Sequence, residues 1–171
     1  MKATEVLADG FGRIREVVHE VVEGLSAEEL NARTDAEANS IAWLVWHLTR
    51  IQDDHVADAA DRDQVWLSEG WATQFDLPLP ARSTGYGHTA RQAGAVRVES
   101  GELLLGYLDA VHEQTTAFVR GLAATDLGRV IDDSWDPPVT LGVRLVSVLS
   151  DDLQHAGQAA FVRGVLERRP R

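Results

Sequence analysis

Two aspartates, a histidine and a glutamine crowd into SDDLQHAGQ, residues 150–158, within a segment that is otherwise mostly apolar. Asp151 precedes His155 by four residues and Gln158 follows it by three, so a helix places all three on one face. A four-residue step along a helix is a rise of about 6 Å, which lets a carboxylate and an imidazole reach one cation. The alternative is a surface Asp–His pair that contributes about 0.3 kcal/mol.

A second histidine makes the metal interpretation stronger. His47 lies in the apolar stretch IAWLVWHLTRI, where an imidazole without a partner is costly. Helical bundles build metal sites from side chains on facing helices. His47, Asp151 and His155 together form a set of two imidazoles and one carboxylate, which leaves coordination positions open for water or substrate. We therefore predict a divalent metal site, with zinc as the first expectation and nickel or manganese as alternatives.

The remaining polar residues of this region suggest supporting roles. Asp152 and Gln158 are candidate catalytic residues that orient a ligand or relay a proton. His55 lies about 12 Å further along the same helix than His47, too far to share its ion. The three other histidines, at positions 19, 88 and 112, have no neighbours in the sequence that suggest a role.

The residues that would bind the metal must be positioned by helices. Apolar residues recur at three- and four-residue steps in 6–25, 41–63, 99–122 and 141–169, which predicts four long amphipathic helices. No run alternates long enough to require a strand, although GRVIDDSW at 128–135 could be a short extended segment. The prediction is an all-α protein, a four-helix bundle that forms a single domain over the whole chain.

A long crossover loop interrupts this pattern between the second and third helices. Residues 63–98 show no sustained periodicity, and loops of this length are uncommon unless they have a function. One interpretation is a strap that packs its aromatic side chains on the bundle. The other is a strap that also walls a pocket, in which Trp66, Trp71 and Tyr86 form the mouth for an apolar electrophile or its co-substrate.

Composition restricts the possible partners. The net charge of −11 disfavours nucleic acids and anionic membrane surfaces as partners. No stretch is long and apolar enough to span a membrane, and the N-terminus lacks the features of a secretory signal, so we expect a cytoplasmic protein. There is no cysteine, so thiol chemistry would need a thiol from outside the chain.

NSIAWLVWHLTRIQDDH, together with H-A-G-Q near the C-terminus, resembles the DinB/YfiT-like superfamily of small metal-binding helical proteins. The resemblance covers nearly the whole chain and includes the Y-G-H-T of the loop. It implies that His47 and His155 are metal ligands and that Asp151 stands where relatives usually have histidine. Asp151 then either coordinates through oxygen or leaves the ion with two firm ligands.

The resemblance also implies an activity. Characterised relatives are metal-dependent S-transferases that join a low-molecular-weight thiol to a small electrophile. The first motif and the arginine-rich composition are typical of an actinobacterial branch, for which the thiol would be mycothiol. The alternatives are a mycothiol-dependent isomerase and a stress protein that binds a metal or small ligand without catalysis. Relatives commonly dimerise, so a homodimer is a further expectation.

Overall fold

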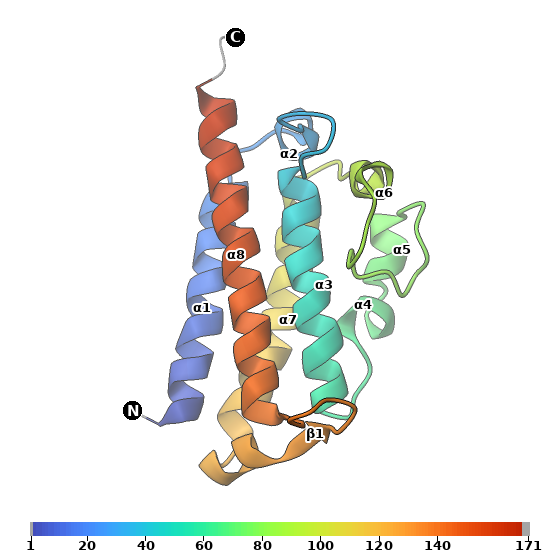
Figure 1. Ribbon diagram of the computed structural model, residues 1–171. Coiled ribbons are helices and arrows are strands. Elements are labelled where there is room, and N and C mark those ends of the chain that lie inside the picture. The colour runs from blue at the N-terminus through green and yellow to red at the C-terminus, as the bar shows by residue number, and fades with distance from the viewer. Residues whose placement is uncertain (1, 169–171) are drawn as a thin grey trace.

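Four long helices form the frame of the computed structural model, which describes residues 2–168 (Figure 1). They are α1 (Ala3–Val22), α3 (Ile41–Ala59), α7 (Gly101–Gly121) and α8 (Leu141–Glu167). Helix α1 packs against α7 and α8, and α3 packs against the same two helices from the other side. The predicted all-α bundle is therefore confirmed. No helix within the described range is both long and apolar enough to cross a membrane.

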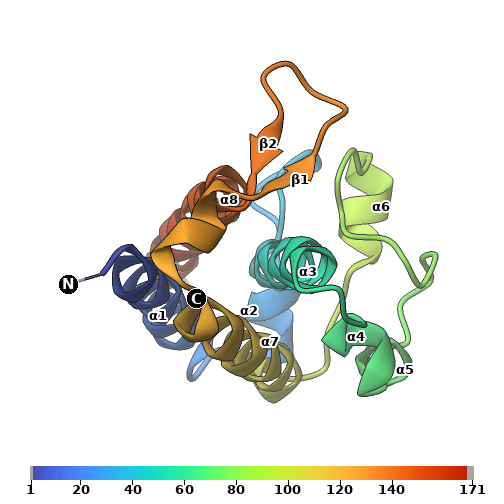
Figure 2. The same cartoon turned by 90° about the horizontal axis from the view of Figure 1, so that it is seen from below.

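Helix α3 is the most enclosed of the four, and Figure 2 shows it with elements on every side. Its N-cap is Ser40, whose hydroxyl accepts a hydrogen bond from the Trp43 amide at 3.1 Å. Every residue from Ile41 to Asp53 is buried, because α7 and α8 cover two of its faces and the crossover segment covers another. The helix ends at Ala59, before the expected end at residue 63, because Asp61 takes a left-handed conformation with φ of 51°.

The crossover segment contains three short helices, so the expectation of a loop without regular structure is wrong in part. They are α4 (Val65–Ser68), α5 (Trp71–Phe75) and α6 (Ala90–Ala95). Helices of one to two turns are too short to produce a recognisable apolar period, which is why the sequence did not reveal them. We call residues 63–98 the strap, and Figure 1 shows it on the outer side of α3.

A buried polar network fastens the strap to the bundle. The Asp53 carboxylate accepts hydrogen bonds from the backbone amides of Val65 and Trp66, at 2.9 and 2.8 Å. It also accepts one from the Tyr107 hydroxyl at 2.8 Å, and the Arg50 guanidinium lies 3.7 Å away. Arg50 and Asp53 are both buried, so this network links the start of the strap firmly to α3 and α7.

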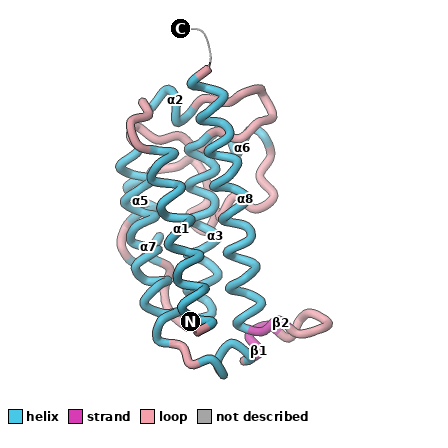
Figure 3. Tube along the Cα trace, turned by 90° about the vertical axis from the view of Figure 1, so that its left-hand side faces the viewer, coloured by secondary structure: helices cyan, strands magenta, loops and turns pink. Residues whose placement is uncertain are grey.

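The remaining elements lie at the two ends of the bundle. Helix α2 (Ala27–Asn31) follows α1, and the 3₁₀ helix η1 (Ala124–Gly128) follows α7. Strands β1 (Val130–Asp132) and β2 (Val139–Thr140) form a small antiparallel hairpin that projects beside the start of α8 (Figure 3). The segment 128–135, expected to be extended, contains β1.

Candidate metal centre

The structure brings His47, Asp151 and His155 together between α3 and α8. Each offers one ligand atom, and the three atoms lie within 4.8 Å of one another. The Asp151 Oδ1 and His155 Nε2 atoms are 3.7 Å apart, as the four-residue spacing predicts. His55, in contrast, accepts a hydrogen bond at Nδ1 from the Arg144 guanidinium at 3.3 Å and does not belong to the group. We call these three residues the ligand group.

The imidazole of His47 is oriented by contacts on two sides. Its Nδ1–H donates a hydrogen bond to the Thr84 carbonyl oxygen at 2.6 Å, because a carbonyl can only accept. The ring stacks on Trp43, with centroids 4.5 Å apart and planes 18° from parallel. Burial lowers the pKa of His47 below its usual range, which keeps the ring neutral. The neutral ring thus has its Nε2 lone pair free for a ligand.

Gly85 makes this hydrogen bond possible. A Cβ atom built at position 85 would lie 2.5 Å from Nδ1 of His47 and 3.1 Å from the Trp46 ring. The residue also has a φ of 96°, a conformation that side chains disfavour. Only glycine lets the strap backbone approach the imidazole closely enough for the Thr84 carbonyl to accept its proton. Sequence reasoning missed this residue, which directly precedes the Y-G-H-T motif at 86–89.

His88 helps to hold the strap backbone near His47, because it hydrogen-bonds to Trp43 on α3 and to Ser83 on the strap. Its Nδ1 accepts the indole N–H of Trp43 at 3.2 Å, so its Nε2–H donates to the Ser83 hydroxyl at 2.8 Å. The Ser83 carbonyl in turn accepts a hydrogen bond from Nε of Arg50 at 3.1 Å. His88 is therefore a positioning residue for the turn that carries Thr84, a role that its sequence neighbours did not suggest.

On α8, His155 is held by Gln158. The Gln158 Oε1 accepts a hydrogen bond from Nδ1–H of His155 at 3.2 Å, which leaves Nε2 facing Asp151. The His155 ring meets the His47 ring edge to face, with centroids 4.7 Å apart and an interplanar angle of 79°. Gln158 thus contacts a candidate metal ligand, and its expected role in orienting that ligand stays a prediction.

The donor set of the ligand group fits a divalent metal ion. The Oδ2 atom of Asp151 is buried and has no hydrogen-bond partner among residues 2–168. Both imidazoles have Nε2 free because their Nδ1–H groups are engaged. Two imidazole nitrogens and one carboxylate oxygen suit zinc, nickel or manganese, and a three-residue set leaves positions for substrate. The coordination of Asp151 through oxygen, as against two firm ligands, stays a prediction.

Asp152 is placed very differently from its neighbour. Its side chain is fully buried in the bundle interior, and neither carboxylate oxygen has a hydrogen-bond partner in the described chain. Burial, with the charge of Asp151 second, raises the pKa of Asp152 well above its usual range. The structure therefore shows no hydrogen-bonded path for the proton relay that we expected from this residue.

The three aromatic residues expected at the mouth do not form one wall. Trp66 is 3% exposed, and its indole N–H donates to the Ala81 carbonyl at 2.8 Å. Trp71 packs beside Tyr107, with ring centroids 5.7 Å apart. Tyr86 is 89% exposed. Trp66 and Trp71 therefore match the interpretation of a strap that packs its aromatic side chains on the bundle.

A groove along α8 begins at the ligand group instead. It has a volume of about 600 Å³ and shares Asp151 with the ligand group. Val143 and Val146 form its apolar part and are 53% and 57% exposed. Its other lining residues are small or polar: Gly142, Ser147, Ser150 and Gln154. This groove is a better candidate than the strap aromatics for holding an apolar substrate beside the ligand group.

Comparisons with known proteins agree with this picture. The family described as the DinB superfamily matches residues 11–159. A crystal structure titled as a conserved protein from Enterococcus faecalis superposes with a TM-score of 0.90 at 34% sequence identity, covering 95% of this chain and 96% of that one. A comparison with curated proteins finds no match.

Proposed function

This chain belongs to the DinB superfamily, and from that premise we propose that it is a metal-dependent S-transferase. It would join a low-molecular-weight thiol, mycothiol in the first instance, to a small electrophile. The superfamily includes metal-dependent enzymes, and the ligand group supplies a place for such a metal. The thiol and the electrophile come from the resemblance of the motifs, and their identity is the part that needs testing.

The observation that carries the proposal is that the ligand group has unpaired acceptor atoms. Two imidazoles have free Nε2 atoms and a carboxylate has a buried oxygen without a partner, all on facing helices. The Asp151 side chain is 38% exposed and opens onto the α8 groove. A purely structural polar cluster would satisfy its acceptors internally, whereas this one leaves them available to a ligand.

In the proposed reaction the thiolate sulfur attacks an electrophilic carbon. A sulfur–carbon bond forms, the leaving group departs with its electron pair, and the thiol proton goes to solvent. A divalent ion bound by the ligand group would lower the pKa of the thiol and so supply thiolate at neutral pH. Since the chain has no cysteine, the nucleophile must come from outside.

The residues of the chain would orient and bind the reactants. Thr84 and Gln158 hold the two imidazoles in one tautomer and one rotation through their hydrogen bonds. Val143 and Val146 would hold the apolar body of the electrophile beside Asp151. Net charge of −11 is consistent with a neutral small substrate better than with a polyanion. A cytoplasmic location and a homodimer belong to the same proposal.

The test is a conjugation assay with metal-loaded protein. Mycothiol, bacillithiol and glutathione are each incubated with 1-chloro-2,4-dinitrobenzene, and product formation is followed by absorbance. We expect metal-dependent acceleration, greatest with mycothiol, that is lost in His47→Ala and His155→Ala. His55→Ala is the matched control because His55 lies on the same helix outside the ligand group, and it should keep the activity.

Two outcomes would contradict the proposal in different ways. Metal that is bound through His47 and His155 without acceleration by any of the three thiols would favour the binder without catalysis. Metal content that is unchanged in both alanine variants would show that the ligand group is not the metal site. Elemental analysis of the purified variants distinguishes these two cases.

A further inference from the structure

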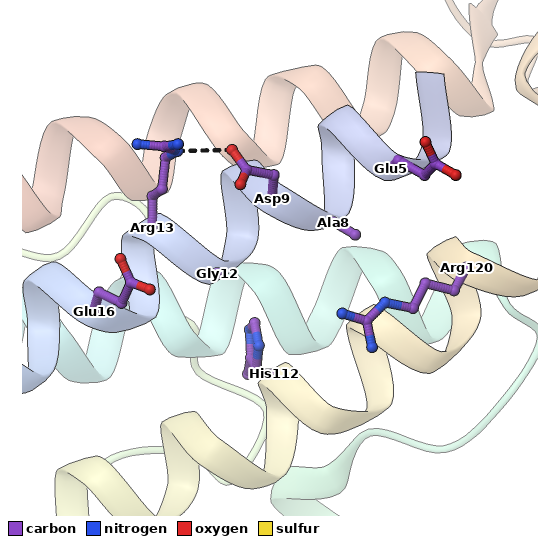
Figure 4. Close-up of a pocket in the computed structure, with 8 residues that line it drawn as sticks. All are labelled: Glu5, Ala8, Asp9, Gly12, Arg13, Glu16, His112 and Arg120. Carbon is purple, nitrogen blue, oxygen red and sulfur yellow. Dashed lines mark hydrogen bonds and ion pairs between the residues drawn. The ribbon is translucent and has the colours of Figure 1, made fainter. Parts of the chain in front are cut away.

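A second candidate site lies between α1 and α7, two helices that contribute none of the metal ligands. A groove of about 440 Å³ runs along their outer face (Figure 4). Ala8 and Gly12, one turn apart on α1, form its floor. A Cβ atom built at Gly12 would meet no atom within 4 Å, so the floor is open. The space is therefore bounded by small residues and rimmed by charged ones.

Part of the charge at the rim is already paired. Arg13 donates from Nε to Asp9 at 2.7 Å, and Glu5 accepts the backbone amide of Lys2 at 2.8 Å. These four groups are paired with one another along α1, so they are less able to bind a ligand. The other charged side chains that line the groove are not paired in this way.

Three rim side chains are free. Glu16, His112 and Arg120 make no side-chain hydrogen bond or ion pair within residues 2–168, and all three line the groove. Arg120 lies close enough to His112 for its charge to contribute to the lowered pKa of that imidazole, which burial lowers most. Figure 4 shows the guanidinium of Arg120 extending along α7 toward His112. An unpaired cation and an imidazole donor thus line the same groove.

The unpaired charges of Arg120 and Glu16 lie toward opposite ends of the groove. Helices α1 and α7 are antiparallel, since Gly101 at the start of α7 lies against Val22 at the end of α1. Arg120 therefore lies toward the start of α1 and Glu16 toward its end, and Figure 4 shows them on either side of Gly12. The unpaired cation therefore lies toward one end of the small-residue floor and the unpaired carboxylate toward the other, with Glu5 lining the groove at the Arg120 end and Arg13 at the Glu16 end.

We propose that this groove binds a small zwitterion that carries one carboxylate and one ammonium group. The carboxylate would pair with the planar guanidinium of Arg120 and accept a hydrogen bond from His112. The ammonium would lie at Glu16. A simple anion would be opposed by the acidic rim and by the net charge of −11, whereas a zwitterion has no net charge to repel. The site is separate from the metal centre and does not depend on the proposed transferase activity.

The test compares three ligands of matched length: 4-aminobutanoate, butanoate and 1-butylammonium. Calorimetric titration of the full chain measures affinity, and the ring signals of His112 in NMR report the place of binding. We expect the zwitterion to bind at least about tenfold more tightly than either single ion, the gain from one charge-assisted hydrogen bond. Equal affinities for all three ligands, or no binding of the zwitterion, would overturn the proposal.

Substitutions of groove residues test whether the zwitterion binds in this groove. Arg120→Gln and Glu16→Gln should each weaken the zwitterion by about tenfold. Gly12→Leu should abolish binding by filling the groove, and it favours helix formation in α1, so the fold is retained. Arg97→Gln is the control, since Arg97 is an exposed arginine outside the groove. Binding that survives Gly12→Leu would refute the site, and unchanged metal content in all variants would confirm its independence.

Discussion

Two aspartates buried in the same bundle have opposite surroundings. Asp53 on α3 is 2% exposed and accepts three hydrogen bonds, from two backbone amides and the Tyr107 hydroxyl. Asp152 on α8 is 0% exposed, and neither of its oxygens has a hydrogen-bond partner in the described chain. The first carboxylate belongs to the network that fastens the strap, and the second lies next in sequence to a residue of the ligand group.

The electrostatics of the two sites differ accordingly. Burial raises the pKa of Asp53, but the amide of Trp66, the Tyr107 hydroxyl and the charge of Arg50 all act to lower it. Burial also raises the pKa of Asp152, and there the only other contribution, from Asp151, raises it further. Asp53 can therefore retain its charge through its partners, whereas Asp152 is held in its protonated form to a higher pH.

The difference in hydrogen bonding distinguishes polar groups that hold the fold together from polar groups that can still bind a ligand. The Asp53 carboxylate is satisfied by three donors, which fixes the position of the strap and therefore of Thr84 and Gly85. In the ligand group, Asp151 on α8 has a buried oxygen without a partner among the described residues, and the imidazoles of His47 on α3 and His155 on α8 each have a free nitrogen. Buried acceptors are normally satisfied, so the unsatisfied ones indicate where a ligand is expected.

Breaking the network around Asp53 should have the largest effect on stability. Asp53→Asn removes the charge that faces Arg50 and leaves a buried guanidinium without its counter-ion. We expect a loss of about 3–5 kcal/mol in the free energy of unfolding, measured by urea denaturation. Asp54→Asn is the control, because Asp54 is partly exposed, accepts one hydrogen bond from Gln64 and should cost under about 1 kcal/mol. Similar losses in both variants would contradict the structural role of Asp53.

The next prediction concerns the link between the strap and the ligand group. Gly85→Ala places a Cβ atom against Nδ1 of His47 and strains a backbone with φ of 96°. Because the Thr84 hydrogen bond would be displaced, we expect metal affinity to fall by about 10- to 100-fold in a chelator competition assay. Gly87→Ala is the matched control, since Gly87 also has a positive φ, 71°, but its Cβ would meet nothing within 4 Å. Equal losses would assign the effect to backbone strain alone.

The sequence was sufficient for the parts of the site that depend on helix periodicity. The spacing of Asp151 and His155 places them together on any helix, and His47 was recognisable because its neighbours are apolar. The inward orientation of Asp152 was also available from the sequence, since Val148 and Ala156 lie four residues before and after it and share its buried face. An acidic residue in that row should have been predicted to lie in the core.

The contribution of the strap could not be predicted in the same way. Thr84 contacts His47 through a backbone carbonyl, and any residue type supplies one, so position 84 carries no chemical signal. The requirement for glycine at position 85 arises from its close approach to a residue 38 positions earlier in the chain, which local patterns do not encode. Trp66 was assigned to a pocket mouth for the same reason: its burial depends on the Asp53 network, a tertiary contact.

A third prediction uses the pH dependence of the unsatisfied carboxylate. The pKa of Asp152 is raised in the folded chain, so its contribution to stability is fully present below the unfolded value of about 3.9. As pH rises above that value, the unfolded chain ionises first and stability falls by about 1.4 kcal/mol per pH unit until the folded pKa is reached. Asp152→Asn cannot ionise and should therefore be more stable than the natural chain at neutral pH, but not at pH 3.

Urea denaturation between pH 3 and 8, with a chelator present so that metal binding does not contribute, checks this prediction. Asp53→Asn provides the contrast, because it should be destabilising at neutral pH, where Asp152→Asn is stabilising. A difference between Asp152→Asn and the natural chain that stays constant across the whole pH range would show that the ionisation of Asp152 has no part in stability.

The smallest expected effect is at the exposed edge of the ligand group. Gln158→Leu removes the acceptor that holds Nδ1–H of His155, so the ring can rotate or change tautomer and metal affinity should fall by no more than about tenfold. Gln154→Leu is the control on the same helix, since within residues 2–168 the Gln154 side chain bonds to Ser150 alone. Neither variant should change the free energy of unfolding by more than about 0.5 kcal/mol, because both side chains are exposed. A loss of metal affinity without a loss of stability would mark Gln158 as a residue that orients a ligand, in contrast to Asp53, whose substitution affects the whole fold.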